Sequence, residues 1–77
     1  MRLFAALREM AGEARLDVDG DTVDAVVATL TEKYGERFGE IARAGSAVVD
    51  GERAGFDREL SGDEEVALLP PVSGGAG

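Results

Sequence analysis

A change of hydrophobic period at Thr22 restricts the fold of this chain more than any other feature of its sequence. After Thr22, apolar side chains recur at helical spacing, as Val23, Val26, Val27, Leu30 and Tyr34. Asp21 or Thr22 can cap the start of this helix, and Gly35 can end it. Because valine lowers intrinsic helix propensity, packing against a sheet must hold the helix in place. The sequence therefore predicts one main helix laid across a sheet.

The segments on either side of this helix have the alternation typical of strands. The expected strands cover residues 2–7, 14–19, 47–49 and 65–69. Gly12 lies in a turn between the first two, and Asp50-Gly51 is a strong turn signal after the third. Residues 55–60 fit a short edge strand or a loop, and the pattern does not decide between them.

A second, shorter helix is expected over residues 36–43, with Phe38, Ile41 and Ala42 facing inward and Gly45 at its end. The order of elements places the first and last strands as parallel, central neighbours. We therefore predict an α+β fold of the β-grasp (ubiquitin-like) type, a roll in which a mixed sheet of four to five strands packs against one main helix.

Composition narrows the chemistry available to these 77 residues. The chain has no histidine and no cysteine, which excludes a Ser/His/Asp triad, disulfides and most transition-metal sites. We therefore expect no catalytic residues of its own and no bound cofactor. The spacing of Asp17, Asp19 and Asp21 resembles a calcium loop, but Thr22 and Ala28 stand where that motif needs glycine and glutamate, so no metal site is predicted.

A net charge of −8 argues against partners that are nucleic acid or anionic membrane, and it favours a basic partner surface. The same charge also fits simple solubility or a salt-rich cytoplasm. No apolar run is long enough to span a bilayer, and Arg8-Glu9 interrupts the first apolar stretch too early for a signal peptide. The expected location is the cytoplasm.

The last residues form the most specific chemical feature. Pro70 and Pro71 end the final strand because proline fixes φ and lacks a backbone donor. Gly74 and Gly75 have no Cβ, so the backbone there can enter a channel too narrow for side chains. A frayed terminus is the alternative interpretation. We expect a domain over residues 1–72 and a flexible tail over residues 73–77.

Three blocks of sequence carry a resemblance to a known family. They are Leu3-Phe4-Ala5-Ala6-Leu7-Arg8-Glu9 with Gly12, then Thr22-Val23, then the run from Gly62 to Gly75 that ends in Pro-Pro-Val-Ser-Gly-Gly. Together they resemble the MoaD/ThiS sulfur-carrier family, and most closely MoaD, the small subunit of molybdopterin synthase. The double proline and the early Leu-Phe block favour the molybdenum-cofactor branch over the thiamine-pathway carriers.

The resemblance implies a ubiquitin-like sulfur carrier whose C-terminal glycine carboxylate is adenylated and then converted to a thiocarboxylate. Its implied partners are an E1-like, MoeB-like adenylyltransferase that uses ATP, a sulfurtransferase or cysteine desulfurase, and the MoaE-like large subunit of molybdopterin synthase. Three alternatives stay open: a ubiquitin-like protein modifier, a carrier for thiamine or cysteine synthesis, and an interaction domain with an inactive tail.

By the same resemblance, Gly75 would carry the reactive carboxyl and Gly74 would give clearance. Partner contacts would fall on Pro70, Pro71, Val72, Ser73, Leu68, Leu69 and Phe4. Ala76 and Gly77 depart from the family pattern, so we favour their removal by a protease over loading at Gly77 or an inactive tail. The acids Asp63, Glu64 and Glu65 fit either a solvated turn or a surface that steers a basic activating enzyme.

Overall fold

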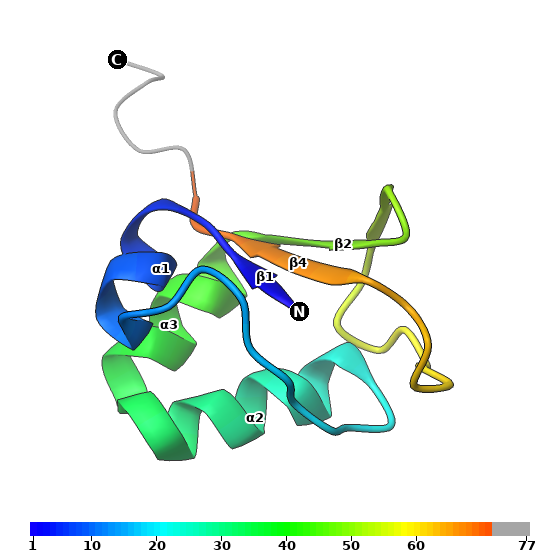
Figure 1. Cartoon of the computed structure of the whole chain (residues 1–77), viewed down its shortest axis with the longest axis horizontal. Helices are drawn as coiled ribbons and strands as arrows, with labels where there is room; N and C mark the ends of the chain where they lie inside the picture. The colour runs from blue at the N-terminus through cyan, green and yellow to red at the C-terminus, as the bar shows by residue number, and fades with distance from the viewer. Residues whose placement is uncertain (72–77) are drawn as a thin grey trace.

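The computed structural model describes residues 1–71, which form a four-stranded mixed sheet and three helices. The elements are β1 (Arg2–Leu3), α1 (Ala5–Ala11), α2 (Val23–Tyr34), α3 (Glu36–Ala44), β2 (Ser46–Val49), β3 (Glu52–Ala54) and β4 (Val66–Leu69). Helices α2 and α3 lie on one side of the sheet, and no helix within residues 1–71 covers the opposite side (Figure 1). This is the predicted β-grasp arrangement, in which α2 is the predicted main helix, α3 is the predicted second helix and α1 is an additional helix that was not predicted.

The strand order β1-β4-β2-β3 makes β4 a central strand. It pairs in parallel with β1, where Leu3 lies opposite Leu68, and antiparallel with β2, where Ala47 lies opposite Leu68. The predicted parallel pairing of the first and last strands is confirmed. The predicted central position of the first strand is wrong, because β1 lies at the edge of the sheet.

The first expected strand, residues 2–7, is a strand only at its start, and its second half belongs to a helix. Only Arg2 and Leu3 pair with β4, and α1 runs from Ala5 to Ala11. Gly12 caps its C-terminal end with a φ of 79°, in the left-handed region. Alanine, leucine, arginine, glutamate and methionine are strong helix formers, and they make up all of α1. Leu7 is fully buried, so the short helix is held by packing as well as by propensity.

The second expected strand, residues 14–19, is an irregular segment along the edge of β1. It makes one bridge, between Arg15 and Arg2, and two flanking backbone bonds: the Leu3 N–H donates to Ala14 at 2.9 Å and the Leu16 N–H donates to Met1 at 3.1 Å. A ladder needs a partner of matching length, and β1 has only two residues. The alternation still identified the inward side chains, because Leu16 and Val18 pack against the core.

The start of α2 is fixed by Thr22 and by the loop over residues 55–60. The Thr22 hydroxyl accepts from the Ala25 N–H at 3.0 Å, which confirms the predicted cap. The N–H groups of Val23 and Asp24, which have no partner within a helix, donate to carbonyls of this loop at 3.0 and 2.8 Å. Residues 55–60 are thus an anchored loop, and the short edge strand is β3 instead.

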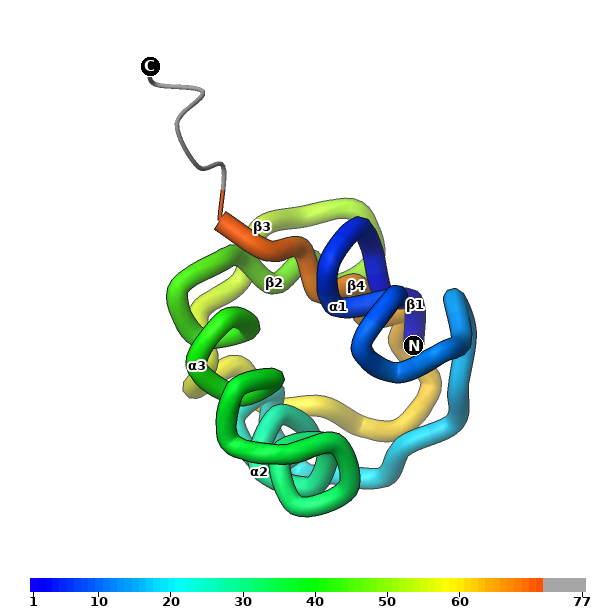
Figure 2. The backbone as a smooth tube through the Cα atoms, turned by 90° about the vertical axis from the view of Figure 1, so that its left-hand side faces the viewer, coloured from blue at the N-terminus to red at the C-terminus, as the bar shows by residue number. Residues whose placement is uncertain are grey.

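The core lies between the helices and the sheet. It consists of Leu3, Leu7, Val23, Val26, Val27, Leu30, Phe38, Ala42, Ala47, Val49, Val66 and Leu68. Phe38 and Ala42 of α3 are buried as predicted, whereas Ile41 is half-buried. Seen from the side, the chain closes around this core (Figure 2). Within residues 1–71, no helix is both long and apolar enough to cross a bilayer.

Candidate functional site

The polypeptide leaves the fold at the end of the central strand. Side chains alternate along β4, so Leu68 is fully buried while Leu69 is half-buried on the outer face of the sheet. The following Pro70 is half-buried and Pro71 is exposed, and neither can extend the ladder. The predicted site residues Val72, Ser73, Gly74 and Gly75 lie outside the described residues. The structure therefore places the root of the tail, at Leu69–Pro71.

Gly45 lies against this root. A Cβ at Gly45 would collide with the carbonyl oxygen of Leu69 and would come within 2.9 Å of the Pro70 carbonyl carbon. Glycine is therefore required for the α3–β2 junction to approach the backbone at the root of the tail. The sequence predicted Gly45 only as the end of a helix. Its contact with Leu69 and Pro70 depends on the pairing of β2 with β4, which no local signal in the sequence gives.

A shallow groove of about 400 Å³ runs beside the root on the outer face of the sheet. Gly45, Ser46 and Val48 line one part of it, and Arg53, Leu69 and Pro70 line another. Arg53 donates to the Ser46 hydroxyl at 3.0 Å and so lies across β2 toward the root. Sequence reasoning missed Arg53 because its position depends on the pairing of β3 with β2.

Phe4 is the one large apolar residue that is exposed among residues 1–71, with 38% of its surface accessible. It follows β1 directly and precedes α1, and the Arg2 guanidinium lies 5.8 Å from the centre of its ring. Of the predicted partner-contact residues, Phe4, Leu69, Pro70 and Pro71 are accessible. Leu68 lies in the core and supports this surface from below.

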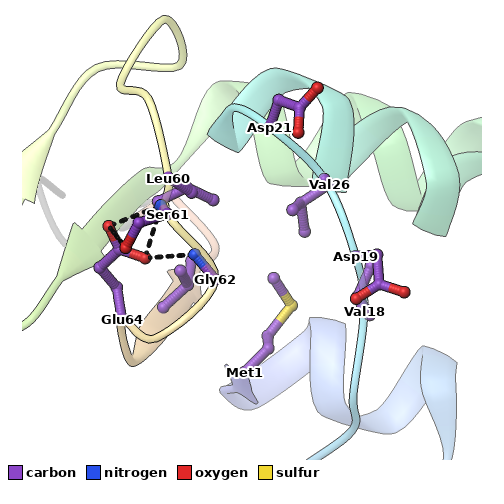
Figure 3. A pocket seen from close by; sticks show the side chains of 11 residues that line it. Met1, Val18, Asp19, Asp21, Val26, Leu60, Ser61, Gly62 and Glu64 are labelled. Carbon is purple, nitrogen blue, oxygen red and sulfur yellow. Dashed lines mark hydrogen bonds between the residues drawn. The ribbon is translucent and has the colours of Figure 1, made fainter.

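The acidic turn before β4 is bound to its own backbone. The Glu64 carboxylate accepts from the Ser61 N–H at 2.9 and 3.0 Å, from the Gly62 N–H at 3.0 Å and from the Ser61 hydroxyl at 3.2 Å (Figure 3). These bonds, chiefly those from backbone N–H groups, lower the pKa of Glu64 to about 2. Glu64 is thus a turn residue, and its charge is satisfied within the chain.

Glu65 is also engaged within the chain. Its carboxylate lies 3.3 Å from Arg15 and 3.7 Å from the N-terminal amine of Met1. Its backbone N–H donates to the Asp50 carboxylate at 2.9 Å. Two of the three acids expected to steer a basic enzyme therefore already have partners in the described fold.

A cavity of about 240 Å³ opens beside the same turn (Figure 3). Met1, Val18, Val26 and Leu60 give it apolar walls, while Asp19 and Asp21 stand at its rim. Among residues 1–71, no three acidic side chains come close enough together to hold a metal ion.

Comparison with known proteins gives a match over nearly the whole chain. The model of the ThiS family matches residues 1–75, which ends at the second glycine of the pair. A relative from Haloferax volcanii, small archaeal modifier protein 1, is 38% identical over an alignment of 84 residues. The alignment covers 96% of this chain and 97% of that protein.

Solved structures agree with this match. The small archaeal modifier protein 1 of Methanosarcina acetivorans superposes with a TM-score of 0.82 at 30% identity, over 95% of this chain and 91% of that chain. A putative molybdopterin converting factor subunit 1 of Pyrococcus furiosus has a TM-score of 0.70 over 92% of this chain and 93% of that chain. Its identity is 22%, so this similarity concerns the fold alone.

Proposed function

Because the chain belongs to the ThiS family, whose ubiquitin-like members serve as sulfur carriers and protein modifiers, we propose that it works through an activated C-terminal glycine. The observation that carries this proposal is the continuity between fold and tail. The central strand β4 ends at Leu69, two prolines lead out of the sheet, and the family match continues to Gly75. The globule then acts as a handle by which an enzyme presents that glycine to a nucleophile.

The chemistry requires an activating enzyme because a carboxylate is a poor electrophile. The Gly75 carboxylate oxygen attacks the α-phosphorus of ATP and pyrophosphate leaves, which gives an acyl-adenylate. A nucleophile then attacks the acyl carbon and AMP leaves. Hydrosulfide as the nucleophile yields a thiocarboxylate, whereas a lysine amine yields an isopeptide bond after losing a proton. One activated species therefore serves both products.

We propose protein modification as the leading use of this species. Its support is the similarity to two small archaeal modifier proteins, at 38% and 30% identity over nearly the full chain. The acceptors would be lysine side chains of other proteins. An E1-like adenylyltransferase is the partner that this role requires.

Sulfur donation for molybdopterin is the second candidate. Its support is the closing motif, in which an acidic turn and an apolar strand are followed by Pro-Pro-Val-Ser-Gly-Gly. This role would add a sulfurtransferase and the large subunit of molybdopterin synthase as partners. Both roles use the same carboxyl, so they differ only in the acceptor.

We further propose that the reactive glycine is Gly75. The family match ends at this residue, whereas Ala76 and Gly77 follow it in the sequence. Hydrolysis of the Gly75–Ala76 peptide bond by a protease would expose the required carboxylate. Loading at Gly77 is the competing possibility, and the mass of the loaded species separates the two.

Intact mass spectrometry of the protein from its native cells tests this function. Loss of the mass of Ala76 and Gly77, with a further gain of about 16 mass units where sulfur replaces oxygen, would establish a trimmed sulfur carrier. Higher-mass adducts that survive reducing agent and require ATP would establish a modifier.

A Lys33→Arg variant is the matched control, because Lys33 is the only lysine of the chain. Side-chain adducts that this variant still forms must join the carrier to another protein. An untrimmed chain with neither product, under conditions rich in ATP and sulfur, would contradict the proposed function.

A further inference from the structure

The irregular segment over residues 15–19 leaves backbone groups unpaired on its outer side. Arg15 forms the bridge to Arg2 of β1, and the two backbone bonds of this bridge come from the residues on either side of that pair. In this arrangement the N–H and C=O groups of the two bridging residues point away from each other. Those of Arg15 therefore face outward, and alternation turns those of Asp17 the same way. In the described part of the chain, none of these groups bonds to another backbone group.

This segment forms one flank of the molecule (Figure 2). Arg15, Asp17 and Asp19 are exposed, whereas Leu16 and Val18 pack against the core. An edge with free N–H and C=O groups can take up an extended segment of another chain, which then adds a strand through backbone bonds. The segment is thus open to pairing along its outer side.

A hollow of about 320 Å³ lies beside this edge. Met1 and Leu16 supply apolar parts of its wall, and Asp17 and Asp63 line it as well. Within residues 1–71, neither of these two carboxylates takes part in an ion pair. A long side chain with a positive end fits both features, because its stem can pack on the apolar parts while its charge stays near the carboxylates.

The basic side chain that lines the hollow is already paired. The Arg15 guanidinium lies 3.3 Å from the Glu65 carboxylate, so its charge is balanced within the chain. The carboxylates of Asp17, Asp19 and Asp63 have no such partner in the described fold. The edge therefore combines free backbone groups with an excess of negative charge.

We infer that the edge at residues 15–19 binds an extended segment of another protein that carries basic side chains at alternate positions. The backbone of this segment bonds to the outward groups of Arg15 and Asp17. One basic side chain enters the hollow toward Asp63. A second, two residues along, lies on the same face and meets Asp19.

This edge is separate from the tail. The hollow lies before the start of β4, whereas the tail leaves from the end of β4 at Leu69. Four strand residues separate the two places by roughly 13 Å. A partner can therefore hold the edge while an enzyme holds the tail, and binding at the edge needs no activation of the tail.

The same carboxylates argue against two other occupants. A second copy at this edge would place Asp17 and Asp19 beside their own counterparts, because a two-fold interface is self-complementary and like charges opposite each other destabilise a sheet. Charged side chains at an edge also disfavour pairing with uncharged strands. A basic strand is the occupant for which these charges are favourable.

The test uses the peptide acetyl-Lys-Val-Lys-Val-Lys-Val-amide and the full chain at about 0.15 M salt, where distant charges are screened. Two matched peptides are compared with it. One has glutamate in place of lysine, and the other has N-methyl groups on its backbone nitrogens, which keep the charge and remove the donors. NMR titration gives the affinity of each peptide, and amide hydrogen exchange of the protein locates the pairing.

We expect the lysine peptide to bind and to slow hydrogen exchange at the Arg15 and Asp17 amides by at least about tenfold. The N-methylated peptide should bind at least about tenfold more weakly, because it cannot complete the backbone bonds. The glutamate peptide should also bind at least about tenfold more weakly, because its charges repel the edge.

Two double variants test the hollow. Asp17→Asn with Asp63→Asn should weaken binding of the lysine peptide about fivefold. Glu32→Gln with Glu40→Gln is the matched control, because it removes the same charge from exposed helix positions, and it should bind as wild type does. Equal affinities of the two variants would contradict the placement of the basic side chain.

The remaining outcomes each overturn the inference. Equal binding of the N-methylated peptide, or unchanged exchange at Arg15 and Asp17, would mean general attraction to an acidic surface. Equal binding of the glutamate peptide would mean that the edge pairs without regard to charge. Protection of these amides that grows with the concentration of the free protein would place a second copy at the edge.

Discussion

The two ends of strand β4 use polar groups in opposite ways. At its start, the turn that contains Glu64 saturates its carboxylate with three donor groups of Ser61 and Gly62, and the adjacent Glu65 pairs with Arg15. At its end, Leu69 leads into two prolines beside a groove where Arg53, among residues 1–71, bonds to the Ser46 hydroxyl and to no carboxylate. The carboxylates of Glu64 and Glu65 at the first end are bound within the chain, whereas the guanidinium at the second end has no carboxylate partner among residues 1–71. Acidic residues close in sequence to a C-terminal glycine pair are therefore not by themselves evidence of docking.

The largest expected loss of stability comes from truncating the buried side chain next to the root of the tail. Leu68→Ala removes a fully buried side chain next to the root, and we expect it to lower the free energy of unfolding by about 3 kcal/mol. Leu69→Ala, one residue along and half-buried on the outer face, should cost about 1 kcal/mol or less. Urea denaturation measures both values. Equal losses would mean that the two faces of β4 do not differ as the alternation requires.

Gly45→Ala should cause the next largest loss of stability, because the substitution affects the C-terminal end of β4. The added Cβ meets the backbone of Leu69 and Pro70, which cannot move without shifting the central strand, so we expect a loss of about 2 kcal/mol. Gly55→Ala is the matched control, since its Cβ would meet only the carboxylate end of the exposed Asp57 side chain, which can rotate away.

The readout that distinguishes positioning from stability is the loading rate, measured at a temperature where both glycine variants are folded. Gly45→Ala should load more slowly than Gly55→Ala, because the root of the tail has moved. If the two variants load at the same rate, Gly45 supports the fold only.

Sequence patterns predicted the inward residues better than the elements that carry them. Leu16 and Val18 pack on the core as their alternation predicts, yet no strand forms there, because β1 offers only two residues to pair with. Residues 5–11 form a helix that the sequence analysis assigned in part to a strand, although their intrinsic propensity favours a helix. Short segments are decided by their neighbours, which a local pattern does not contain.

The residues of the candidate site also fall into those that local sequence predicts and those that depend on distant contacts. The closing motif with Pro70 and Pro71 is local, so the sequence located the root of the tail. Gly45 and Arg53 reach that root only through the α3–β2 junction and the β2–β3 pairing. Their role depends on contacts between residues that are distant in sequence, and no single stretch of the chain signals it.

The pH dependence of stability tests the bonding of Glu64 in the turn before β4. The pKa of Glu64 is lowered to about 2 in the folded chain from an ordinary value of 4.5, so the charged carboxylate is bound more strongly when the protein is folded. Its contribution to stability is complete above about pH 4.5 and is lost as the pH falls toward 2. We therefore expect wild type to be more stable than Glu64→Gln at pH 7, with the difference shrinking through this window. A difference that does not change with pH would contradict the bonding of the turn.

The smallest expected effect concerns the ion pair at the same end. The side chains of Arg15 and Glu65 are 69% and 47% exposed, so water and salt screen their attraction. Arg15→Gln should therefore lower the free energy of unfolding by less than about 0.5 kcal/mol, and added salt should remove even that difference. The affinity of this variant for the proposed E1-like activating enzyme, measured by calorimetry, should equal that of the wild type. Weaker binding by Arg15→Gln would show that the start of β4 also contacts the enzyme, and the contrast between the two ends would then be one of degree.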